Sequence, residues 1–118
     1  MEPSSTAAQD EEVDPRAASA LVDQGAMLVD VREPQEWAAG RAPGAVHLPM
    51  RSLPLGFTDL PADRPLLIVC RSGSRSAVAA AFLRRTGRDA RNVTGGLRAW
   101  VRSGLPLVDD QGEPGTVI

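Results

Sequence analysis

The chain has 118 residues, of which 42% are hydrophobic and 24% are charged, and its formal net charge is −2 at pH 7. This length fits one domain, and the balance is that of an ordinary globular protein. The weak net charge favours neither nucleic acid nor an anionic membrane as a partner, and no apolar run approaches the roughly 20 residues of a membrane-spanning helix. All 13 basic residues are arginines, which excludes chemistry that depends on a lysine.

A single cysteine, Cys70, and a single histidine, His47, limit the redox and metal chemistry. One cysteine forms no intrachain disulfide, and one Cys with one His does not make a four-ligand zinc site. We therefore expect no metal and no cofactor. Because the chain has no second thiol, any group that Cys70 accepts must be removed by an external acceptor.

The N-terminal part contains a polar segment, a helix and a strand. Residues 1–12 are rich in Ser, Ala and acidic residues, so we expect disorder rather than a secretory signal, and a cytoplasmic protein. Asp14 followed by Pro15 is typical of a helix start, and Gly25 of its end. The continuous apolar character of 26–31 predicts a strand that is covered on both faces.

The middle of the chain is predicted to hold short elements. Pro34 starts a short helix that Gly40 ends, and 45–48 is a second short strand. The segment 51–57 contains Pro and Gly, which favours an irregular stretch or a short helix. We expect no long regular element between the first strand and residue 66.

The second half holds the clearest strand and the longest helix. The four apolar residues at 66–69 predict a buried strand, and 74–85 predicts a helix that Gly87 stops. A short strand at 90–93 and a helix at 96–103 follow. We expect Val78 and Val101 to face inward, with Ala79, Phe82 and Leu83 on the first helix and with Leu97 and Trp100 on the second.

The order of these elements predicts the fold class. Strands alternate with helices, which is the pattern of an α/β domain with a mainly parallel sheet. We assign 13–107 to this domain and expect 108–118, which is rich in Pro, Gly and Asp, to be a loose tail. Ligands of such folds bind beyond the carboxyl ends of the strands, and the strand at 66–69 brings Cys70 to that edge.

The residues around Cys70 suit an anionic sulfur. A loop before a helix N-terminus carries unpaired N–H groups, which favour an anion together with the helix dipole. A glycine permits the tight turn, serines supply hydroxyl donors and arginines add positive charge. In such surroundings a cysteine pKa falls from about 8.5 to roughly 3.5–7.5, which predicts a Cys70 thiolate at neutral pH. The loop reads Cys70, Arg71, Ser72, Gly73, Ser74, Arg75, Ser76.

A buried and inert cysteine at a strand end is the alternative for Cys70 alone, because free cysteines often pack as small apolar residues. The attached loop of Gly, Ser and Arg, followed by a helix, favours a functional cysteine instead. We therefore interpret Cys70 as a nucleophile.

The chain resembles the rhodanese family through four motifs in the family's order. They are Asp30-Val31-Arg32-Glu33 with Glu36-Trp37, then Gly40-Arg41-Ala42-Pro43-Gly44-Ala45, then the Cys70 loop, then Thr94-Gly95-Gly96 with Trp100. Each motif alone is a weak signal, whereas the four together are specific.

The resemblance implies a three-layer fold with a parallel sheet of about five strands and helices on both faces. It also implies that Cys70 takes a sulfane sulfur from a donor such as thiosulfate, carries it as a persulfide and passes it to cyanide or a thiol. Small molecules are thus the expected partners, and the residues do not define the oligomeric state. The implied substrate-binding residues are Arg71, Ser72, Gly73, Ser74 and Arg75, of which the two arginines would bind the anionic donor.

The chain departs from the family where Arg41-Ala42 stands in place of a common His-Ile. This position belongs to the rim of the site, so we expect changed access and one more positive charge, with the chemistry unchanged. Among the other motif residues, we expect Asp30 and Arg32 to form an internal charge pair, Glu33 and Glu36 to lie on a solvated helix face, and Trp37 and Trp100 to pack in the core.

Two other functions compete with turnover of a sulfur donor. A rhodanese-like module that carries sulfur or docks a partner would need the same Cys70. Phosphatases and arsenate reductases also place a cysteine loop before a helix, but their Cys-x5-Arg spacing is longer than the Cys-x4-Arg of this chain. A smaller ring of amides suits one sulfur atom better than a tetrahedral oxyanion, so we rank sulfur transfer first.

Overall fold

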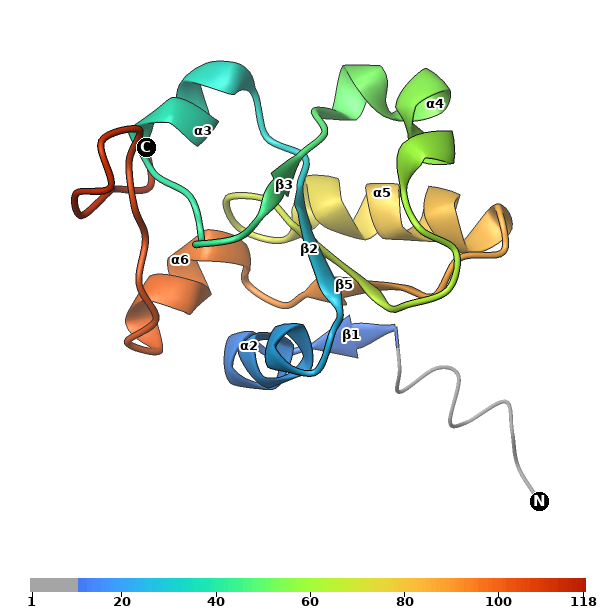
Figure 1. Cartoon of the computed structure of the whole chain (residues 1–118), viewed down its shortest axis with the longest axis horizontal. Helices are drawn as coiled ribbons and strands as arrows, with labels where there is room; N and C mark the ends of the chain where they lie inside the picture. The colour runs from blue at the N-terminus through green and yellow to red at the C-terminus, as the bar shows by residue number, and fades with distance from the viewer. Residues whose placement is uncertain (1–10) are drawn as a thin grey trace.

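The four apolar residues after Pro65 form β4 (Leu66–Val69), the fully buried central strand of the molecule. It pairs in parallel with β2 (Met27–Asp30) on one side and with β5 (Ala90–Val93) on the other. The edge strands β1 (Glu12–Val13) and β3 (Val46–His47) complete a five-stranded parallel sheet of order β1-β5-β4-β2-β3 (Figure 1). This computed structural model describes residues 11–118.

Helices cover both faces of the sheet, as expected for the α/β class. Side chains alternate along β4, so that Leu66 and Ile68 enter one core cluster and Leu67 and Val69 enter the other. The first cluster includes residues of α4 (Leu53–Gly56) and α5 (Ser74–Arg85), and the second includes residues of α2 (Pro15–Asp23) and α6 (Gly96–Arg102). The remaining helical elements are α3 (Pro34–Ala39), η1 (Met50–Ser52) and η2 (Phe57–Asp59). No helix within residues 11–118 is long and apolar enough to cross a membrane.

Two valines that the sequence pattern places in the core lie at the surface of the structure. Val78 is 64% exposed and Val101 is 47% exposed, so the expectation that they face inward is wrong. The buried side of α5 is instead the row of Ser76, Ala79, Ala80 and Leu83, whose 3–4 spacing turns position 78 outward. Trp100 is buried as expected.

Trp37 is only half-buried, contrary to the expectation that it packs in the core. Its ring stacks on His47 at 4.6 Å between centroids, and the guanidinium of Arg41 lies over it at 4.7 Å. An aromatic ring placed at a surface can pack against polar partners in this way.

The C-terminal segment 108–118 is hydrogen bonded rather than loose. Val108 bridges to Arg41 and Pro114, and the Thr116 N–H donates to the Ala39 carbonyl at 3.0 Å. A side chain on Gly40 would come within 2.5 Å of Thr116, so glycine at this position permits the close approach. Figure 1 shows this segment beside α3.

The predicted disorder of 1–12 falls mostly on residues 1–10, which lie outside the described residues. At the end of that range, Glu12 pairs with Asn92 in the first strand of the sheet.

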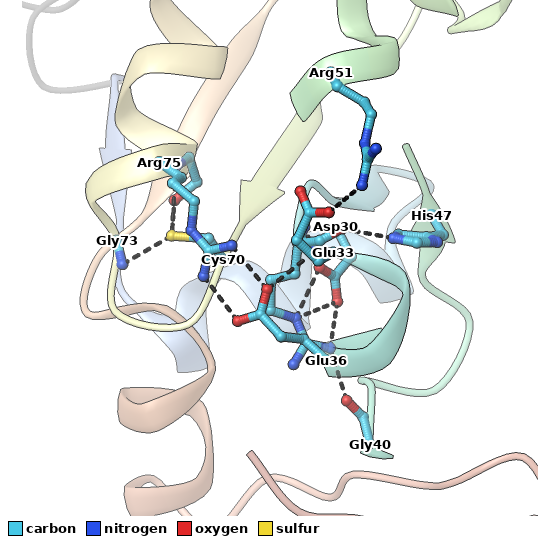
Figure 2. A network of polar contacts seen from close by, with 11 residues as sticks. Asp30, Glu33, Glu36, Gly40, His47, Arg51, Cys70, Gly73 and Arg75 are labelled. Atoms are coloured by element: carbon cyan, nitrogen blue, oxygen red, sulfur yellow. Dashed lines mark hydrogen bonds and ion pairs between the residues drawn. The ribbon is translucent and has the colours of Figure 1, made fainter. Parts of the chain in front are cut away.

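A buried ion pair organises the carboxyl end of β2, as the sequence predicts. Arg32 Nη2 lies 2.8 Å from Asp30 Oδ2, and neither side chain is exposed. Arg32 Nη2 also donates to the Gly40 carbonyl at 2.7 Å, and the Arg32 carbonyl bonds to His47 Nε2 at 2.7 Å (Figure 2). The ion pair therefore fixes the end of β2 against the end of α3 through Gly40, while the Arg32 backbone connects this segment to β3 through His47.

Removal of this carboxylate leaves a buried guanidinium without its counter-charge. We predict that Asp30→Asn lowers the free energy of unfolding by about 3–5 kcal/mol, measured by urea denaturation. The matched control is Asp89→Asn, which breaks the surface pair with Arg91 at the same sequence spacing, and for which we expect less than about 1 kcal/mol. Equal losses in the two variants would contradict the role of burial.

Candidate active site

The sulfur of Cys70 lies directly after β4 and is surrounded by hydrogen-bond donors. Cys70 is fully buried. Its Sγ accepts from the Gly73 N–H at 3.1 Å, from the Ser76 N–H at 3.4 Å and from the Ser76 hydroxyl at 3.2 Å (Figure 2 shows the first contact). Gly73 lies directly before α5, and Ser76 lies in its first turn. N–H groups at these positions have no partner within the helix. The sequence-predicted anion site before this helix is thus occupied by the sulfur itself.

The loop points its N–H groups at the sulfur because its carbonyls are bound elsewhere. The N–H of Leu97 donates to the Cys70 carbonyl at 2.8 Å, and the N–H of Arg98 donates to the Arg71 carbonyl at 3.0 Å. These donors belong to the first turn of α6, so α6 holds the outer side of the loop. A Cβ on Gly96 would lie 2.5 Å from the Cys70 carbonyl oxygen, and φ of Gly96 is +62°, so glycine is required at this contact.

Gly73 closes the turn as expected. Its φ is +106°, in the region that favours glycine, and it precedes the first residue of α5. Ser72 and Ser74 are exposed, and no hydrogen bond from their hydroxyls to Cys70 is seen within the described residues. Ser76, one turn into the helix, is the serine whose hydroxyl reaches the sulfur.

Burial and hydrogen bonds act on the pKa of Cys70 in opposite directions. Burial raises the pKa of the thiol, while the Ser76 hydroxyl and the N–H groups of Ser76, Gly73 and Ser72 lower it, and the net result is a lowered pKa. Donors that point at a sulfur stabilise its charged form. This direction agrees with the sequence-based expectation of a thiolate.

Arg75 is held by a carboxylate on another helix. Its Nη1 and Nη2 donate to Glu36 Oε1 and Oε2 at 2.8 and 2.9 Å, a bidentate pair that joins α5 to α3 (Figure 2). The hydrogen bonds from Arg75, helped by the Glu33 backbone, lower the pKa of Glu36 to about 2 although burial opposes this. Glu36 is therefore part of the site and not of a solvated helix face, which corrects the sequence-based expectation. Both terminal nitrogens of Arg75 have Glu36 as a partner. Its role in binding the anionic sulfur donor stays a prediction.

Arg71 differs from Arg75 in its surroundings. Its Nε is buried without a hydrogen-bond partner, and the described residues offer its guanidinium no ion pair. Among the loop arginines it is thus the one with donors to spare for an anion.

The two departures from the family pattern have structural explanations. Arg41 lies over Trp37 and pairs with Asp110 at 2.6 Å, so its extra positive charge is neutralised. Ala42 is buried in the core cluster that contains Trp100.

Two side chains near the sulfur were missed as site residues by sequence reasoning. The sequence does not distinguish Ser76 from the other two loop serines, and it gives no local motif that places Asn92 of β5 at the site. Asn92 Oδ1 lies 2.6 Å from the Ser76 hydroxyl. Asn92 is 5% exposed. A polar residue within a predicted strand is the signal in the sequence that could have pointed to it, because buried polar groups need hydrogen-bond partners.

The Glu36–Arg75 pair makes stability depend on pH in a defined window. The pKa of Glu36 is about 2 in the folded protein against an ordinary value of 4.5, so its contribution is complete above about pH 5 and is lost as the pH falls toward 2. We predict that Glu36→Gln lowers the free energy of unfolding at pH 7 by about 1–2 kcal/mol, discounted for the partly exposed Arg75.

The same variant should lose less stability than the wild type between pH 5 and pH 2, which denaturation at several pH values measures. Glu33→Gln, in the exposed pair with Arg51, is the control and should change stability by less than about 1 kcal/mol. An unchanged pH dependence in Glu36→Gln would contradict the assignment.

Comparisons with known proteins place the chain in one family. The model of the rhodanese-like domain matches residues 14–103. A sulfurtransferase of Allochromatium vinosum is 45% identical over 87 residues, which are 73% of this chain and 81% of the relative. The thiosulfate sulfurtransferase GlpE of Pseudomonas syringae is 40% identical over 101 residues, covering 85% of this chain and 94% of the relative.

Solved structures agree with this placement. The crystal structure of a rhodanese-related protein from Thermoplasma volcanium superposes with a TM-score of 0.79 at 28% identity, covering 83% of this chain and 97% of the other. Fold, motif order and relatives thus agree, and the resemblance in the sequence is confirmed. The chain belongs to the rhodanese-like domain family and is a sulfurtransferase of the rhodanese type.

Proposed function

We propose that Cys70 accepts a sulfane sulfur from an anionic donor such as thiosulfate and passes it to cyanide or to a thiol. The observation that carries this proposal is the set of donors around Sγ, two backbone N–H groups and one hydroxyl within 3.4 Å. Such a set stabilises a thiolate, which is the nucleophilic form of cysteine.

The two steps balance without an external oxidant or reductant. The Cys70 thiolate attacks the outer sulfur of thiosulfate, a new S–S bond forms, and the old S–S bond breaks with its electron pair leaving on sulfite. The acceptor then attacks the outer sulfur of the Cys70 persulfide, and Cys70 leaves as a thiolate. Cyanide would become thiocyanate, and a thiolate would become a persulfide.

The loop supplies what each step needs. The N–H groups of residues 71–75 are the groups that we propose to hold the charge on the outer sulfur of the persulfide. Arg71, with a buried Nε that has no partner among the described residues, is the group that we propose to meet the anionic donor. Arg75 is the second arginine that we propose to contact the anionic donor, and Glu36 holds its guanidinium in position.

The partners in this proposal are a small sulfur donor and a small acceptor. We place the reaction in the cytoplasm, where a reducing thiol pool supplies acceptors and keeps a lone cysteine free of disulfides.

Mass spectrometry of the intact protein tests the sulfur-transfer step. After incubation with thiosulfate, we predict a gain of the mass of one sulfur atom, reversed by cyanide with release of thiocyanate. Cys70→Ser should show no gain, because a hydroxyl does not carry a sulfane sulfur. Full thiocyanate release by Cys70→Ser, or hydrolysis of a phosphate ester by the wild type in place of sulfur uptake, would overturn the proposal.

The donor-binding role of Arg71 has a kinetic test. We predict that Arg71→Gln raises the KM for thiosulfate about tenfold, since it removes charge-assisted hydrogen bonds to the anion. The control is Arg102→Gln, which removes the same charge from the exposed end of α6 and should leave the KM within about twofold, as expected of a screened surface charge. An equal effect of the two substitutions would show that only the general field of the protein matters.

A further inference from the structure

Two acceptors compete for one hydrogen beside the reactive sulfur. Ser76 Oγ lies 3.2 Å from Cys70 Sγ and 2.6 Å from Asn92 Oδ1. A serine hydroxyl has a single hydrogen to donate, and both a thiolate and an amide oxygen only accept. The hydroxyl therefore satisfies one of them at a time.

The orientation of the Asn92 amide follows from its other contacts. Its Nδ2 donates to the Gly73 carbonyl at 3.2 Å and to Glu12 Oε1 at 3.1 Å. Rotating the amide by half a turn would bring Oδ1 against these two acceptors, so the amide places Nδ2 there and Oδ1 at Ser76. Asn92 is 5% exposed, and Ser76 is fully buried, so water does not readily replace these partners.

We propose that Asn92 is a positioning residue that holds the Ser76 hydroxyl and competes with Cys70 for its hydrogen. When Cys70 is a thiol, the hydrogen lies on the short contact to Asn92, and Ser76 Oγ accepts the S–H. When the thiol proton leaves to solvent, the hydroxyl turns to the charged sulfur, and Asn92 Oδ1 loses its donor.

This competition limits how far the thiolate is stabilised. A thiolate gains the Ser76 hydrogen bond only by breaking the one to Asn92, so Asn92 opposes part of the lowering of the Cys70 pKa. Nucleophilicity falls as the pKa of a thiol falls, and the best attacking thiol has a pKa near the ambient pH. By opposing part of this lowering, Asn92 makes the ionised form of Cys70 the stronger nucleophile.

The hydroxyl also has a reason to return during the reaction. Once a second sulfur is attached, the negative charge leaves Sγ for the outer sulfur, and the hydrogen bond to Asn92 forms again. This return rests on the proposed persulfide, whereas the competition for the hydrogen does not.

The charged groups around the site are unchanged by the test. They are Arg71 in the loop, Arg75 of α5 with its partner Glu36 of α3, the Asp30–Arg32 pair at the end of β2, and Glu12 of β1 behind Asn92. Substitution of Ser76 or Asn92 by alanine alters none of these charges.

The experiment is a pH titration of the ultraviolet absorbance of the thiolate. The chain has one cysteine and no tyrosine, so the signal reports Cys70 without a phenolate background. For Ser76→Ala we expect a higher titration midpoint, with the thiolate-to-thiol ratio at a fixed pH reduced about threefold to tenfold. For Asn92→Ala we expect the opposite sign and a comparable size.

The double variant separates competition for the hydrogen from a general disturbance of the loop. In the Ser76→Ala background, Asn92→Ala should leave the midpoint unchanged, because the hydroxyl is absent. A lower midpoint in Asn92→Ala alone, absent in the double variant, supports the proposal. An unchanged or raised midpoint in Asn92→Ala, or the same shift in both backgrounds, overturns it.

A matched control removes another side chain that bonds to Glu12 of β1 but does not bond to Ser76. Thr94 Oγ1 donates to Glu12 Oε1 at 3.1 Å, as Asn92 Nδ2 does, and Thr94→Ala should leave the midpoint unchanged. If Asn92→Ala does not fold, Asn92→Leu has a similar shape, lacks the acceptor and carries the same expectation. The titration uses no sulfur donor, so its failure is distinct from a failure of the proposed sulfur transfer.

Discussion

The placement of backbone N–H groups around one buried sulfur is the constraint on which the rest of the site depends. When the N–H groups of a loop point at a buried atom, the buried carbonyls of that loop need hydrogen-bond partners of their own. Here the carbonyls of Cys70 and Arg71 accept from the first turn of α6. That contact requires glycine at position 96, because a side chain there would overlap the Cys70 carbonyl.

Ion pairs frame this loop, but hydrogen bonds set the state of the sulfur. The Asp30–Arg32 pair fixes the end of β2 against Gly40 at the end of α3, and the Glu36–Arg75 pair joins α3 to α5. Arg32 and Arg75 thus each have a carboxylate partner, which offsets their positive charge near Cys70. The lowering of the Cys70 pKa comes from the Ser76 hydroxyl and nearby N–H groups, acting against burial.

The sequence predicted those features that depend on neighbouring residues. The apolar run at 66–69 gave the central strand and the place of Cys70, and Gly73 before a helix gave the turn. The alternation of strands and helices predicted the α/β class, and the four motifs predicted the rhodanese family. Both predictions are confirmed. The catalytic role of Cys70 and the binding roles of the loop residues stay predictions.

The features that were missed depend on contacts between distant segments. Glu36 is 39 residues from Arg75, and Asn92 is 16 residues from Ser76, so no local pattern joins them. Pro and Gly in the C-terminal segment predict a loose tail because both are common in flexible tails, whereas in the structure Gly115 allows the backbone to approach Gly40 closely. The apolar pattern of α5 places Val78 inward, whereas the buried face of the helix includes the polar residue Ser76 instead.

The measurement that tests the central claim most directly is the pH titration of the Cys70 thiolate in the wild-type protein. If N–H groups and the Ser76 hydroxyl stabilise the charged sulfur more than burial opposes it, the midpoint lies clearly below the value of about 8.5 for a free cysteine. A midpoint at or above that value would show that burial dominates, and it would contradict the account of Cys70 as a stabilised thiolate.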